Sequence, residues 1–96
     1  METIGQRFKQ IRLNEKLSQE EFGETLEMTK SGISAVENDK VFVSVSVLRK
    51  LFLDKNINLN WFICGEGNMY NSKKYADIKS EIIAEVEKML FERGIV

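Results

Sequence analysis

Apolar residues recur along the first part of the chain at the spacing of a helix. Ile4, Phe8 and Ile11 follow one another at i, i+4 and i+7, which places them on one face. Thr3, just before the stripe, and Gln6, within it, form a capping box. In this motif each side chain accepts a hydrogen bond from the other residue's backbone N–H. A helix is therefore predicted from Thr3, with polar side chains on the rest of its surface: Gln6, Arg7, Lys9, Gln10 and Arg12.

A second helix is predicted to begin at Ser18. Ser18 and Glu21 form another capping box, and Leu17 and Phe22 occupy the two positions of a hydrophobic staple around it. The helix should end near Leu26, because the residues after it repeat the signals of a helix start. Two short helices thus adjoin across three or four residues.

The third predicted helix has a small, polar outer face. Thr29 can cap it, and it should end near Asn38, with Ile33 and Val36 turned toward the core. The side chains left to point elsewhere are Lys30, Ser31, Ser34 and Ala35.

The region after the third helix permits two interpretations. Residues 39–43 are predicted to form a loop, and Ser44 can cap a fourth helix with an apolar stripe: Val47, Leu48, Leu51 and Phe52. Valine also stands at every second position from 41 to 47, a pattern typical of a β-strand. We favour the helix because its stripe continues past the valines.

A short fifth helix is predicted after Asn58, which can cap it. Gly65 suits the left-handed residue that ends many helices, so the GEG sequence at 65–67 is explained by a helix end and not by a phosphate-binding loop. Trp61 and Cys64 are expected in the core with the other apolar residues.

The last third of the chain is predicted to be a linker and one more helix. Residues 65–74 are rich in glycine and polar residues, whereas residues 75–93 carry an apolar stripe: Ile78, Ile82, Val86, Met89 and Leu90. This helix either associates with a second copy or folds back onto its own domain. The stripe keeps no strict heptad, so the sequence leaves both open.

Composition excludes several classes of function. A chain of 96 residues has room for one core, and its 43% hydrophobic and 30% charged residues are typical of a folded protein. There is no histidine and one cysteine, so zinc sites and Ser/His or Cys/His catalytic pairs lack their components. We expect no catalytic residue, no metal, no cofactor and no small-molecule substrate. With no signal peptide and no apolar run near the roughly 20 residues that cross a bilayer, a cytoplasmic location without membrane contact is expected.

The segments IGQRFKQIRLNEKLSQEEFGETLEMTKSGISAVENDK and NINLNWFICGEGNMY together resemble the DNA-binding domain of lambda-repressor-like regulators, the XRE or Cro/CI group. The resemblance covers about residues 4–70. It implies an all-α fold with five helices and an additional C-terminal helix. The expected organisation is a helix-turn-helix DNA-binding domain at residues 1–70, followed by a linker and amphipathic helix at residues 71–96.

The resemblance also implies which residues meet DNA. Gln19 takes the position of a glutamine that touches the DNA backbone and helps to orient the recognition helix. The recognition-helix positions are Thr29, Lys30, Ser31 and Ala35, with Gly32 and Ser34 nearby and Lys40 placed for a phosphate. Lys30 can donate to guanine, and the methyl group of Ala35 can lie against that of thymine. Taken alone, Gln19 and Lys30 would be ordinary solvated residues.

Further residues have implied structural roles. Arg12 should pair with Glu37, which ties the recognition helix to the first helix, and Gly23 should take a position in the second helix where a side chain would collide with the third. Glu27 departs from the family pattern, because glycine is common at that turn position and a left-handed glutamate costs on the order of 1 kcal/mol.

The expected function is a homodimeric regulator of transcription that binds double-stranded DNA, with a phage or prophage repressor on an inverted-repeat operator as the specific expectation. The net charge of −1 and the acidic second helix weaken nonspecific attraction to DNA. They favour an alternative, a protein-interaction module that docks onto another regulator or a polymerase through that acidic face or the last helix.

Overall fold

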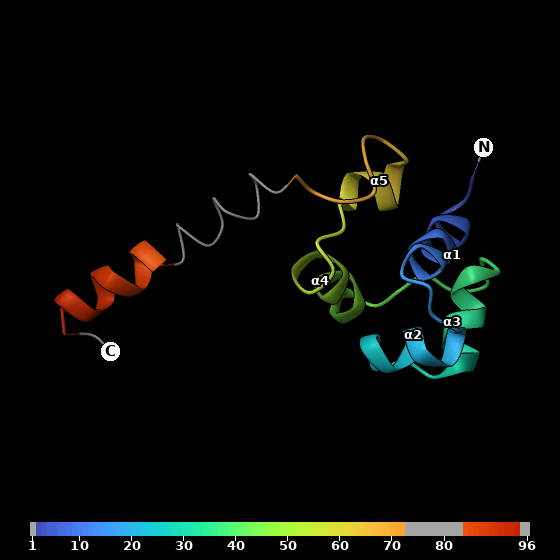
Figure 1. The fold of residues 1–96 in the computed structure, drawn as a ribbon, viewed down its shortest axis with the longest axis horizontal. Coiled ribbons are helices and arrows are strands. Elements are labelled where there is room, and N and C mark those ends of the chain that lie inside the picture. The colour runs from blue at the N-terminus through green and yellow to red at the C-terminus, as the bar shows by residue number, and fades with distance from the viewer. Residues whose placement is uncertain (1, 73–83, 95–96) are drawn as a thin grey trace.

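The computed structural model describes residues 2–72 and 84–94, and helices are its regular elements there (Figure 1). Five of them are α1 (Ile4–Asn14), α2 (Gln19–Leu26), α3 (Lys30–Glu37), α4 (Val45–Leu53) and α5 (Leu59–Cys64). Residues 84–92 form a further helix, which lies apart from these five in Figure 1. The all-α prediction is confirmed. None of the described helices is long and apolar enough to span a membrane.

Each of the five helices begins where the sequence predicts a cap. A side-chain oxygen accepts a hydrogen bond from a first-turn backbone N–H in every case, and the caps are Thr3, Ser18, Thr29, Ser44 and Asn58. Thr3 with Gln6 and Ser18 with Glu21 form complete capping boxes. The competing strand over residues 41–47 is wrong, because the Ser44 hydroxyl accepts from the Val47 N–H and starts α4 there.

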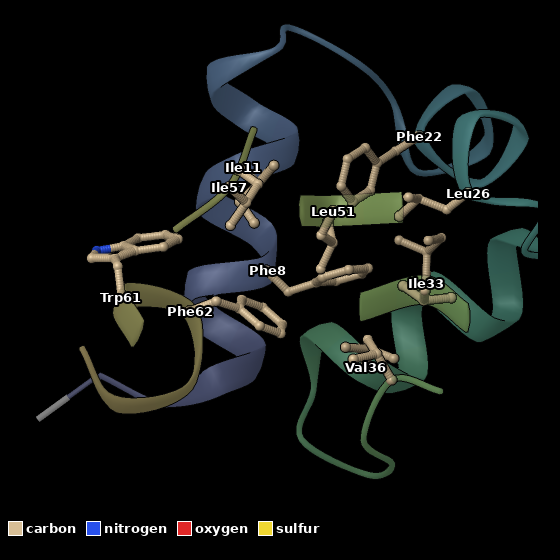
Figure 2. Close-up of a cluster of buried hydrophobic side chains, with 12 residues drawn as sticks. Phe8, Ile11, Phe22, Leu26, Ile33, Val36, Leu51, Ile57, Trp61 and Phe62 are labelled. Carbon is tan, nitrogen blue, oxygen red and sulfur yellow. The ribbon is translucent and has the colours of Figure 1, made fainter. Parts of the chain in front are cut away.

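One apolar core joins the five helices (Figure 2). Phe8 of α1 lies at its centre, with its ring 5.1 Å from that of Phe22 in an edge arrangement and 6.1 Å from that of Phe62. Aromatic pairs at these distances add to the free energy of area burial. The other buried apolar residues are Ile11, Leu26, Ile33, Val36, Val43, Val47, Leu51, Ile57 and Trp61.

Two sequence-based placements are wrong. Arg7 is buried, because its guanidinium donates to the carbonyl oxygens of Phe62 at 2.8 Å, Ile63 at 3.2 Å and Glu2 at 3.1 Å. Arginine can satisfy several acceptors at once, and here it does so at the end of α5. Cys64 is exposed, because α5 ends there and buries only Trp61 and Phe62.

The segment after α5 returns to the loop between α4 and α5. Ile57 and Tyr70 form an antiparallel bridge, and the Asn71 N–H donates to the Asn56 carbonyl at 2.9 Å. The Tyr70 hydroxyl also accepts from Asn14 Nδ2 at 2.8 Å. These bonds hold residues up to 71 against α1 and the loop between α4 and α5.

Residues 84–94 are all exposed. Three residues of the predicted stripe lie here: Val86 and Met89 are half exposed, and Leu90 is 37% exposed. Phe91 beside them is 78% exposed. Ile78 and Ile82, and the predicted helix start near residue 75, lie outside the described residues. The described part of this helix therefore presents apolar side chains that its own chain does not cover.

Candidate nucleic-acid interface

A hollow of about 350 Å³ lies between the start of α2 and the outer face of α3. Its lining contains two lysines and no acidic residue. The lining residues are Gln19, Lys30, Ser31, Ser34, Ala35, Asn38 and Lys40. Exposed lysines and small polar side chains on a helix are the features that permit close approach to DNA.

Most of the residues that sequence reasoning placed at DNA line this hollow together. Thr29 and Gly32 do not: the Thr29 hydroxyl accepts from the Gly32 N–H at 3.0 Å, and this bond caps α3. Asn38 lines the hollow but was missed as a site residue. Its helical spacing of four residues from Ser34 was the available signal, because residues at i and i+4 share a face.

Gln19 is held in place by a buried carboxylate. Its Nε2 donates to Glu37 Oε1 at 3.2 Å. Arg12, which the resemblance pairs with Glu37, donates to the same carboxylate from Nε at 2.7 Å and from the second guanidinium nitrogen at 3.1 Å. The Glu37 side chain is 4% exposed, so its charge meets Arg12 and not the solvent. One carboxylate thus fixes side chains from α1 and α2 relative to α3.

The turn between α2 and α3 is tight and contains a strained residue. Glu27 has φ 56° and ψ 43°, so the left-handed conformation is kept without glycine. Gly23 permits the turn to close, because a Cβ there would lie 2.4 Å from the Met28 carbonyl oxygen. The nearest collision for a side chain at Gly23 is therefore with the turn backbone, and Ile33 of α3 lies farther off at 3.5 Å.

A second close contact sets the end of α3 against the start of α1. A Cβ on Gly5 would lie 2.4 Å from the Val36 carbonyl oxygen and 2.8 Å from that of Glu37. The Asp39 carboxylate accepts from the Gly5 N–H at 2.9 Å and from the Thr3 hydroxyl at 2.6 Å. These contacts anchor the chain between Glu37 and Lys40, at the edge of the hollow.

A comparison with known protein families agrees with this arrangement of α2, the turn and α3. A family model described as a helix-turn-helix domain matches residues 5–68. The chain belongs to this helix-turn-helix family. No curated protein and no solved structure matches the chain. The helix-turn-helix therefore rests on the family model and on the geometry of α2 and α3, and it makes this chain a DNA-binding regulator.

The acidic residues of α2 lie outside the lining of the hollow. The exposed glutamates of α2, Glu20 and Glu24, do not line the hollow. Glu21 is used in the cap, where the Ser18 backbone N–H and then the Ser18 hydroxyl lower the pKa of its carboxyl. No group of three or more His, Cys, Asp or Glu among residues 2–72 and 84–94 is placed to hold a metal ion.

Proposed function

We propose that this helix-turn-helix chain is a sequence-specific regulator that places residues 29–35 in the major groove of double-stranded DNA. The observation that carries the proposal is the hollow itself, whose lining has two lysines and no carboxylate, and whose α3 side chains other than Lys30 are short. Phosphates surround a major groove, so a face without negative charge favours entry into it. The same charge favours DNA over a protein-interaction role for this face.

Individual contacts follow from the chemistry of the lining. Lys30 is exposed on the first turn of α3 and can donate to guanine O6 or N7. Gln19, anchored on Glu37, lies at the first turn of α2, where free backbone N–H groups favour a phosphate. Lys40 follows α3 on the exposed edge of the hollow and serves a second phosphate.

A homodimer would give this regulator two recognition helices. One helix reads a half-site, and a two-fold dimer reaches two half-sites roughly 34 Å apart in an inverted repeat. The exposed apolar residues of 84–92 support self-association there. A dimer that occupies an operator of this kind acts as a repressor by blocking polymerase, and a phage or prophage promoter is the specific setting that we propose.

The dimer is tested with the full chain by analytical ultracentrifugation. Leu90→Glu places a charge on the apolar side of residues 84–92 and should convert the dimer to a monomer. Glu92→Gln, on the same helix, is the matched control and should leave the dimer unchanged. A wild-type chain that is monomeric at micromolar concentration would refute this part of the proposal.

DNA binding is tested by selecting duplexes from a random pool and titrating the selected sequence. Lys30→Ala should reduce affinity by about 5-fold to 150-fold, corresponding to the 1–3 kcal/mol of one good base contact. Gln19→Ala should also weaken binding. Lys9→Ala is the control, because Lys9 is exposed on α1 and does not line the hollow. A pool that yields no preferred sequence, or equal affinity for all three variants, would contradict the proposal.

A further inference from the structure

Two side chains one turn apart on α3 are joined in a way that fixes what each can offer to DNA. Asn38 Nδ2 donates to the Ser34 carbonyl oxygen at 2.8 Å and to the Ser34 hydroxyl oxygen at 3.3 Å. Both bonds hold the amide nitrogen against Ser34, one helical turn back, and turn Oδ1 away from it. The orientation of the Asn38 amide is therefore set from within the helix.

Apart from the amide nitrogen, the pair offers one donor and one acceptor. Within the described residues, no donor reaches Asn38 Oδ1 and no acceptor takes the Ser34 hydroxyl hydrogen. Asn38 is exposed and Ser34 half-buried, and both line the hollow beside Lys30. The pair therefore presents a carbonyl acceptor next to a hydroxyl donor, on the surface that faces the groove.

The acceptor limits the possible partner on DNA. Phosphate oxygens only accept hydrogen bonds, so Asn38 Oδ1 is repelled by them, whereas an amide with a free nitrogen could donate to them. In the major groove the donors are the amino groups of adenine and cytosine. Adenine also carries an acceptor, N7, next to its N6 amino group, and cytosine has no neighbouring acceptor of its own.

We propose that the Ser34–Asn38 pair reads adenine, with Asn38 Oδ1 accepting from the N6 amino group and the Ser34 hydroxyl donating to N7. This inference rests on the proposed DNA-binding function and names one base of its half-site. Two short side chains together supply the donor and acceptor that a single asparagine or glutamine supplies in a bidentate contact with adenine. Lys30, a donor only, then specifies a different base.

The experiment uses the full chain and the duplex selected from the random pool. Each adenine of a half-site is replaced in turn by purine, which lacks the N6 amino group, and by 7-deazaadenine, which lacks N7. At one adenine, each replacement removes one of the two hydrogen bonds and should weaken wild-type binding by about 2-fold to 10-fold. These measurements need no protein variant.

Protein variants assign that adenine to the pair. Asn38→Ala should lose affinity for the adenine duplex but bind the purine duplex as the wild type does, so that the two affinities converge. Ser34→Ala should lose the sensitivity to 7-deazaadenine, and Ser34→Thr, which keeps the hydroxyl, should retain it. Circular dichroism checks that each variant is folded.

Lys40→Ala is the matched control for a phosphate contact. It should weaken binding to all duplexes by one factor and reduce the salt dependence of log K by about one. If Asn38→Ala weakens binding to the adenine, purine and 7-deazaadenine duplexes by one factor, Asn38 contacts the phosphate backbone and the inference is overturned. If the pool yields a specific duplex but no adenine replacement lowers the affinity, the adenine contact is refuted while the proposed DNA-binding function stands. The absence of any specific duplex would instead refute the proposed function itself.

Discussion

Replacement of Arg12 tests how the hollow is held in shape. The Arg12 side chain is 12% exposed and that of Glu37 4%, so Arg12→Met leaves a buried carboxylate without its cation. Breaking a buried pair in this way costs about 3–5 kcal/mol. For a domain of this size each kcal/mol lowers Tm by about 4–8 °C, so a fall of at least about 12 °C is expected. Urea and thermal unfolding of the full chain measure both quantities.

The double variant Arg12→Met with Glu37→Leu separates stability from geometry. Apolar residues replace both charges, and such a replacement of a buried pair is often neutral, so the free energy of unfolding should return to within about 1 kcal/mol of the wild type. Gln19, however, loses its acceptor at Glu37 Oε1. Affinity for the selected duplex should then fall by roughly tenfold, the equivalent of one hydrogen bond.

Two results would refute this reasoning. A double variant as unstable as Arg12→Met alone would show that the pair itself contributes net stability. A double variant that binds DNA as the wild type does would show that Gln19 needs no anchor. Lys55→Met is the control, because it breaks the partly buried ion pair of Lys55 with Glu15, 2.9 Å apart, which does not involve the hollow. It should lower stability and leave DNA affinity unchanged.

Three further predictions concern the scaffold. Arg7→Met removes a cation bonded to three backbone carbonyls and should lower the free energy of unfolding by about 2–4 kcal/mol, whereas Lys9→Met on the exposed face of α1 should change it by less than about 0.5 kcal/mol. An equal effect of the two in urea unfolding would contradict the burial of Arg7. Glu27→Gly relieves the left-handed backbone at φ 56° and should raise stability by up to about 1 kcal/mol. Because it also removes the exposed ion pair with Lys50 at 3.1 Å, Glu27→Ala is the control, and a glycine variant no more stable than the alanine variant would show that the turn holds no strain. Because the Ser18 backbone N–H and hydroxyl lower the pKa of Glu21, its ionised cap stabilises the fold at neutral pH, and this contribution is lost as the pH falls below the ordinary value of 4.5 and through the lowered pKa. Glu21→Gln keeps the acceptor and should reduce the slope of stability against pH between about 5 and 3, and an unchanged slope would exclude Glu21 as a source of the acid sensitivity.

The sequence determined where the helices begin and which of their faces are apolar, because both depend on residues close together in the chain. The two residues of a capping box, such as Ser18 and Glu21, are three positions apart and bond to each other's backbone. An apolar stripe such as that of Ile4, Phe8 and Ile11 has the period of a helix. The turn position of Glu27 came from the resemblance, and the structure shows that its left-handed backbone is kept. The DNA-facing residues came from resemblance, because no local rule assigns Lys30 to a groove.

Tertiary structure alone decided the features that depend on distant partners. Arg7 has the same polar character as its exposed neighbour Lys9, and its burial depends on the Phe62 carbonyl, which lies 55 residues away in the chain. The close approach at Gly5 depends in the same way on where α3 ends. Asn38 is a different case: its bonds to Ser34 are local, four residues apart, and they depend on a side-chain conformation that sequence pattern does not give. Periodicity assigns a side chain to a face, whereas hydrogen-bond partners are fixed when the helices pack.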